Sequence, residues 1–207
     1  GRRALQTQNF TTATDSYNIA VGFEAGHDIT TGIRNTLIGG LAGVELTTGG
    51  SNVALGYEAL KTEDAHGLNT AIGTQALFSL NAGADAYNVA VGYQAGAGVS
   101  TGVQNTLIGG LAGDALTVGN KNIAIGYRTL SDDTKGNKNV AIGNFALSTQ
   151  NFTTATDSFN VGVGHGAGEG ITTGIRNTLI GGLAGDALTD ADDNTAVGMN
   201  ALSTCQL

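Results

Sequence analysis

Residues 139–147 read Asn-Val-Ala-Ile-Gly-Asn-Phe-Ala-Leu, and near-copies of this nine-residue stretch fill the chain. The shared pattern is Asn, a variable residue, a small residue, an aliphatic residue, Gly, two variable residues, Ala, and then Gly or Leu. Internal repetition of this kind is typical of solenoids, in which each unit contacts only its neighbours. The motif begins at Asn18, Asn35, Asn52, Asn69, Asn88, Asn105, Asn122, Asn139, Asn160, Asn177 and Asn194.

The spacing of these starts defines the coil, in which we number positions from the Asn as position 1. Successive starts are 17 residues apart, except for 19 before Asn88 and 21 before Asn160. The insertions therefore follow the nine-residue motif, where Ser, Thr, Asn, Asp and Gly are frequent, as in surface turns. We predict a single repeat domain over residues 1–207, with eleven full coils and a partial N-terminal coil that includes Ala4 and Leu5.

Positions 2 to 4 of each coil alternate in the way that a β-strand does. In the first coil they are Ile19, Ala20 and Val21, which gives the period of two that marks a strand. We expect the β-branched residues to point into the coil and the Ala/Gly positions to form the other face, where a second backbone can approach closely. This small-residue face is interpreted as a subunit interface; the alternative is that it fills a narrow interior.

A slower rhythm of four coils runs through the chain. Position 9 reads Gly, Gly, Leu, Leu and repeats, while three coils carry Leu at position 3 together with Gly at position 6 and Leu at position 7. Bulk added at one position and removed at another predicts that positions 3, 6 and 7 meet in space. The starting Asn is expected in a turn, in a left-handed conformation or bonded to its own backbone, and stacked Asn side chains can bond along the axis.

Composition restricts the class of protein. Glycine accounts for 34 of 207 residues, proline and tryptophan are absent, and 41% of residues are apolar, so the chain is too hydrophobic for a solvated linker. The net charge is −8 and the nine basic residues are scattered, which argues against nucleic acid as a partner. We expect no membrane insertion by this segment, and any export signal to lie outside it. Cys205 is the only cysteine, so disulfides do not stabilise the fold, and its role is not predicted.

The motifs Asn-Ile-Ala-Ile-Gly at 122 and Asn-Val-Ala-Ile-Gly at 139 resemble the YadA-like head repeat of trimeric autotransporter adhesins, and similar repeats occur in phage tail fibres. The resemblance spans essentially the whole chain. It implies a left-handed parallel β-roll, a side-by-side or intertwined homotrimer, and an extracellular place on a virion or a bacterial surface. The 17-residue coil and the Gly-Tyr-Gln-Ala stretch at 92–95 depart from the head pattern and favour the tail-fibre relatives.

Several short motifs could carry chemistry, and each has a simpler structural interpretation. Residues 109–117 nearly match a calcium-binding nonapeptide, but the third glycine of this stretch is one place late, and Val44 stands where other copies have Asp114 and Asp186. The glycine-rich stretch at 162–168 lacks the βαβ unit of a dinucleotide site. His27, His66 and His165 occupy unrelated repeat positions, which argues against a shared metal site within one chain.

Acidic pairs and aromatic residues are the remaining candidates. The pairs Glu63/Asp64, Asp132/Asp133 and Asp192/Asp193 lie in the variable connections, so we expect solvated turns. Four aromatic residues at position 6 suggest either a stacking ladder for a sugar chain or, as we favour, rings that cover the coil edge between subunits; these are Phe23, Tyr57, Tyr93 and Tyr127.

These observations predict an all-β parallel β-solenoid that serves as a structural or adhesive fibre segment, either a spacer or a receptor-contacting shaft. We predict no catalytic, cofactor-binding or metal-ligating residues, and the sequence does not identify receptor-binding residues. The expected partner is the chain itself as a homotrimer, with a host-surface glycan or protein as a possible ligand. The alternatives are an ice- or crystal-binding solenoid, or a non-catalytic part of a polysaccharide-degrading tail spike.

Overall fold

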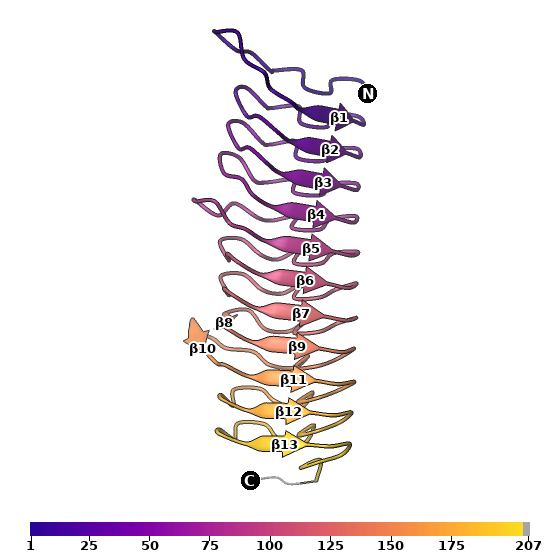
Figure 1. Cartoon of the computed structure of the whole chain (residues 1–207), viewed down its shortest axis with the longest axis vertical. Helices are drawn as coiled ribbons and strands as arrows, with labels where there is room; N and C mark the ends of the chain where they lie inside the picture. Colours follow the sequence, from indigo (N-terminus) through magenta and orange to yellow (C-terminus); the bar gives the residue numbers. More distant parts are fainter. Residues whose placement is uncertain (205–207) are drawn as a thin grey trace.

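The structure is a computed structural model that describes residues 1–204; Cys205 lies outside the described residues. Eleven short strands stack into one parallel sheet that runs the length of a rod (Figure 1). A two-stranded parallel sheet of β8 (Gly136–Asn137) and β10 (Thr156–Asp157) stands beside it. The strands of the long sheet are β1 (Ile19–Val21), β2 (Thr36–Ile38), β3 (Val53–Leu55), β4 (Thr70–Ile72), β5 (Val89–Val91), β6 (Thr106–Ile108), β7 (Ile123–Ile125), β9 (Val140–Ile142), β11 (Val161–Val163), β12 (Thr178–Ile180) and β13 (Thr195–Val197).

The predicted parallel β-solenoid with coils of about 17 residues is confirmed. Each strand occupies positions 2 to 4 of its coil and pairs with the same positions of the next coil, as Ile123 does with Val140. Repeated residues therefore form straight columns along the rod. No helix capable of crossing a membrane occurs in residues 1–204.

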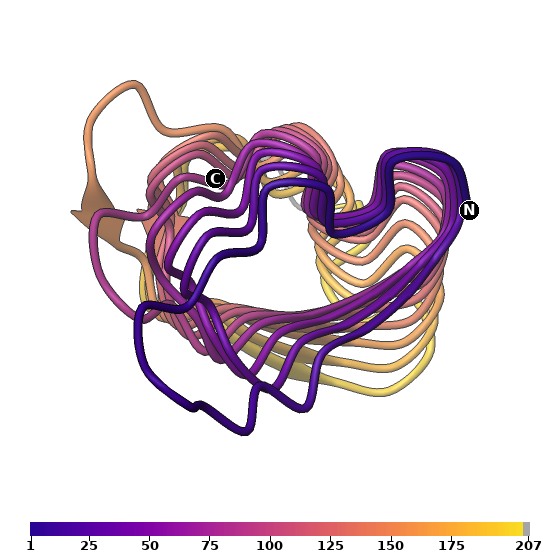
Figure 2. The same ribbon diagram turned by 90° about the horizontal axis from the view of Figure 1, so that it is seen from above.

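The two insertions fall where the spacing placed them. The longer connections near residues 81–86 and 151–158 protrude from one side of the rod, together with the loop that precedes the first coil (Figures 1 and 2). The second insertion forms β10, which pairs with β8 of the preceding coil. Because the extra residues leave the coil at its surface, the long sheet continues across them in register.

The predicted orientation of the strands is wrong. The position-3 residues point inward and are buried in most coils, as at Ala54 and Ala71, whereas the β-branched neighbours point outward: Ile19 is 53% exposed and Val21 is 56% exposed. The small residues are thus the filling of a narrow interior, which was the alternative interpretation. Aliphatic side chains at position 12, such as Leu46 and Leu116, supply most of the remaining interior bulk.

The four-coil rhythm arises from exchange of volume between positions 3 and 9. The side chain of Leu37 fills the space that a Cβ would take at Gly26 and Gly43, at 2.6 and 2.9 Å. Coils with Ala at position 3 can instead carry a buried Leu at position 9, such as Leu60. The partner of the position-3 Leu is therefore position 9, and not position 6 as predicted, because position 6 lies on the outer rim beside the next coil.

The Asn column forms a continuous hydrogen-bonded ladder, as one of our interpretations anticipated. The Oδ1 of each motif Asn accepts the backbone N–H of the next motif Asn along the rod, at 2.9 to 3.2 Å. Its Nδ2 commonly donates to the position-15 carbonyl of its own coil, as Asn122 does to Gly136 at 2.9 Å. The left-handed conformation lies one residue earlier, for example at Lys121 with φ 59°.

Replacing Asn122 by Ala tests the ladder. The change leaves the buried Asn139 N–H and the Gly136 carbonyl without their side-chain partners, so we expect a loss of about 2 to 4 kcal/mol in the free energy of unfolding by urea. Asn194 ends the ladder and is only partly buried, so Asn194→Ala should cost clearly less. Equal losses would show that the ladder does not hold the coils together.

Backbones of successive coils approach closely at position 5, which is Gly in all eleven coils. Gly109 has φ 132°, and a Cβ there would lie 2.3 Å from the Gly126 carbonyl oxygen. We expect Gly109→Ala to lower the free energy of unfolding by at least about 3 kcal/mol. Gly110 is the matched control because a Cβ there meets only the Tyr127 ring, at 3.5 Å or more. If Gly110→Ala proved as damaging in a denaturation experiment, close backbone packing would not be the cause.

Candidate functional site

The most extensive unusual surface is the outward side of the eleven-stranded sheet, which we call the outer sheet face. It consists of positions 2 and 4 of every coil, and each of these residues is Ile, Val, Leu or Thr. Parallel sheets are normally covered on both faces, but here only the inner face is covered. The apolar residues that are at least 36% exposed are Ile19, Val21, Val53, Leu55, Ile108, Ile123, Ile142, Ile180 and Val197.

Aromatic side chains border this face on both sides. Tyr57 and Tyr93, at position 6, are 51% and 56% exposed, and the ring of Tyr57 lies over Gly40 of the preceding coil. A second column stands at the residue before the motif Asn and includes Tyr17, Tyr87 and Phe159. This second column was not predicted from the sequence. The pattern that could have revealed it is the aromatic residue that precedes three of the eleven motif Asn residues.

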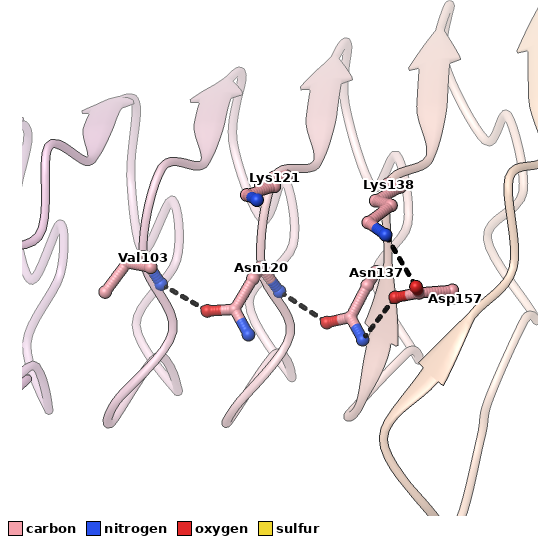
Figure 3. A pocket seen from close by; sticks show the side chains of 6 residues that line it. All are labelled: Val103, Asn120, Lys121, Asn137, Lys138 and Asp157. Atoms are coloured by element: carbon pink, nitrogen blue, oxygen red, sulfur yellow. Dashed lines mark hydrogen bonds and ion pairs between the residues drawn. The ribbon is translucent and has the colours of Figure 1, made fainter.

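A polar pocket of about 280 Å³ lies where β8 and β10 meet the rod. Figure 3 shows its lining of Val103, Asn120, Lys121, Asn137, Lys138 and Asp157. Successive Asn side chains cap backbone N–H groups here, and the Lys138 ammonium bonds Asp157 Oδ2 at 2.5 Å. This contact lowers the pKa of the Asp157 carboxyl. Most of the polar groups that line the pocket hydrogen-bond to one another. We therefore interpret the pocket as the junction between the insertion and the rod.

The prediction that all three acidic pairs lie in solvated turns is wrong for two residues, Glu63 and Asp133. Glu63 and Asp133 are fully buried because they occupy position 12, the interior column that is aliphatic in most coils. Burial raises the pKa of both carboxyls. Aligning the coils at position 12 would have revealed this, since the column otherwise reads Ile29, Leu46, Leu80, Val99, Leu116, Ile171 and Leu188, with Gln150 as the third polar member.

Asp133 is built into a complete polar network. Its Oδ1 accepts the backbone N–H of Gly136 at 2.9 Å, and its Oδ2 accepts the Gln150 amide at 2.7 Å. The Gln150 oxygen in turn accepts Asn160 Nδ2 at 2.7 Å, which links the network to the Asn ladder. These bonds partly compensate the buried Asp133 carboxylate for the water that it loses, but its desolvation still costs free energy.

Glu63 lies in a different setting, together with Asp64 and His66. One ligand atom from each of the three side chains lies within 4.8 Å of the others. No other such group of three occurs in residues 1–204, and in particular Asp114 and Asp186 of the calcium-like stretches each keep a buried oxygen without a hydrogen-bond partner. Of the three histidines, only His66 stands in such a cluster, whereas His27 bonds Asp28 at 2.6 Å and His165 packs against Phe145.

Comparison of the chain with protein-family models, curated proteins and solved structures finds no match. The resemblance to YadA-like head and tail-fibre repeats thus rests on the motif residues alone. What the outer sheet face does must accordingly be argued from its own chemistry.

The buried Asp133 predicts a pH-dependent penalty. Its folded pKa lies above the ordinary value of 3.8, so its contribution to stability is greatest below that value and is lost as pH rises through the folded pKa. In Asp133→Leu/Gln150→Leu, which restores the aliphatic column, we expect a gain in unfolding free energy that grows with pH, by at most about 1.4 kcal/mol per unit. The check is urea unfolding of both proteins from pH 3 upward. A difference that did not change with pH would contradict this account.

Proposed function

We propose that this chain is a shaft segment of a homotrimeric fibre, in which the outer sheet face of each copy packs against the other two. The observation that carries the proposal is an uncharged, β-branched face that runs along the whole rod with nothing covering it. Large exposed apolar faces of this kind mark protein interfaces, and parallel sheets are stable when both faces are covered.

A second and third copy of this chain are the partners that fit best. Every coil presents two outward residues, drawn from Ile, Val, Leu and Thr, at the same spacing, so the face matches its own repeat along the full length of another rod. Closed symmetry would bury the face on each copy at once. The border of Tyr and Phe rings suits the rim of such an interface, because the rings offer apolar area for packing and a Tyr can keep its hydroxyl in water.

This arrangement makes the segment a spacer whose polar insertions face outward. We infer an extracellular place, on a phage tail fibre or a bacterial surface adhesin, and no catalytic role. The motif resemblance supports this inference, and the protruding connections near residues 81–86 and 151–158 are the surfaces from which a host glycan or protein could be contacted. The subunit interface that was expected on the small-residue face is accordingly assigned to the opposite, β-branched face.

Solution mass tests the proposal. By light scattering we expect the chain to have three times its 20.7 kDa mass, and Leu55→Lys/Ile142→Lys to be a folded monomer with unchanged far-ultraviolet circular dichroism. Both side chains are exposed at 43% and 37%, so charge there costs little within one chain but is costly when buried between copies.

The matched control is Thr101→Lys/Thr173→Lys, which adds the same charge on exposed connections away from the strands. This variant should remain trimeric. A folded wild-type monomer would overturn the proposal. Thermal hysteresis by such a monomer would favour the ice-binding alternative, for which the Thr residues at position 2 of five strands are the relevant feature.

A further inference from the structure

The interior column at position 12 contains one buried carboxylate whose hydrogen bonds from the protein are both long. Glu63 is fully buried where most other coils have Ile, Val or Leu. Its Oε1 accepts the His66 backbone N–H at 3.2 Å, and its Oε2 accepts the Ala82 N–H at 3.4 Å. Both bonds are long for a charged acceptor. Asp133, in the equivalent place, has shorter bonds and an amide partner.

His66 is the second exceptional residue at this point of the rod. It occupies position 15, which is Gly in seven other coils, namely at Gly32, Gly49, Gly83, Gly102, Gly119, Gly136 and Gly174. Its Nδ1 is buried and has no hydrogen-bond partner. That atom lies 3.5 Å from Glu63 Oε1, which is too far for a good hydrogen bond. An imidazole nitrogen thus faces a buried carboxylate without bonding to it, while the outer part of the ring reaches solvent.

We propose that Glu63, Asp64 and His66 bind one divalent first-row transition ion of the Zn²⁺ class. Two ligands that each lie about 2.0 to 2.1 Å from a tetrahedral zinc are separated by roughly 3.4 Å, close to the 3.5 Å between His66 Nδ1 and Glu63 Oε1. Asp64 is only half-buried, so its carboxylate can rotate inward as the third ligand, with water completing the shell.

The donor set determines the class of ion. One imidazole nitrogen with two carboxylates suits Zn²⁺, Co²⁺ or Ni²⁺, whereas Ca²⁺ and Mg²⁺ prefer oxygen ligands alone. A bound ion would neutralise the charge of Glu63, which is otherwise buried at a desolvation cost. It would also fix the connection between the coils of Asn52 and Asn69, because Glu63 already contacts Ala82 in the insertion that follows.

The site can be removed by residues that the repeat itself supplies. Glu63→Leu restores the residue of Leu46 and Leu80, and His66→Gly restores the residue of Gly49 and Gly102, so both variants are expected to fold. His27→Ala is the matched control, since His27 pairs with Asp28 alone. All proteins carry Cys205→Ser, so that the single thiol cannot bind the ion.

Binding of ZnCl₂ by calorimetry, with Co²⁺ absorption as a second reading, tests the proposal. We expect one ion per chain, at least a tenfold weaker affinity in His66→Gly and in Glu63→Leu, and an unchanged affinity in His27→Ala. Zinc should also raise the midpoint of thermal unfolding of the parent but not of His66→Gly. The proposal is overturned if the parent binds no zinc saturably, or if His66→Gly binds it as tightly as the parent. If Glu63→Leu fails to fold, His66→Gly decides the question.

Discussion

The in-register stacking of coils at a close backbone separation is the constraint on which the rest of the structure depends. At position 5 the chain passes so near the next coil that a Cβ would collide with its carbonyl oxygen, as at Gly109. The Asn ladder fixes the register, since each side chain satisfies a backbone N–H in the next coil and commonly a carbonyl in its own. A shift by one residue would break both sets of bonds, so every column of side chains follows from this spacing.

Tight stacking also explains why the interior is so small. Strand residues at position 3 face inward, and room remains only for Ala, unless a Gly at position 9 makes space for a Leu such as Leu37. Over four coils the interior is therefore filled by one Leu at position 3, beside two Gly residues at position 9, and then by a Leu at position 9 in each of the next two coils. Where position 12 departs from aliphatic residues, the chain must satisfy a buried polar group: Asp133 does so through Gln150, and Glu63 lies beside a histidine.

Sequence alone was sufficient for the period, the strand positions and the sites of insertion, because all three are recorded in repeated spacing, whereas the Asn ladder was one of several interpretations that it left open. It did not determine which side of the strand faces inward. A period of two separates the faces without labelling them, and β-branched residues suit either a core or an interface. Which face turns inward depends on the interior volume of a 17-residue coil, and this volume cannot be derived from any single motif. Glu63 and Asp133 were misplaced for a related reason: acidic residues in a variable connection resemble solvated turns until the coils are aligned column by column.

Because the strands turn their aliphatic residues outward, and not inward as was expected, they favour association between copies of the chain. The interior holds mostly Ala at position 3 and aliphatic side chains at positions 9 and 12, while the Ile, Val and Leu residues at positions 2 and 4 remain outside on an uncovered parallel sheet. If those residues served the stability of a single rod they would point inward, and if they served solubility they would be polar. Burial of this face against identical rods reconciles the two facts, because the copies together would supply the apolar core that each coil is too narrow to contain. The same logic makes a metal ion useful at Glu63, since a thin rod has little other means of offsetting a buried charge.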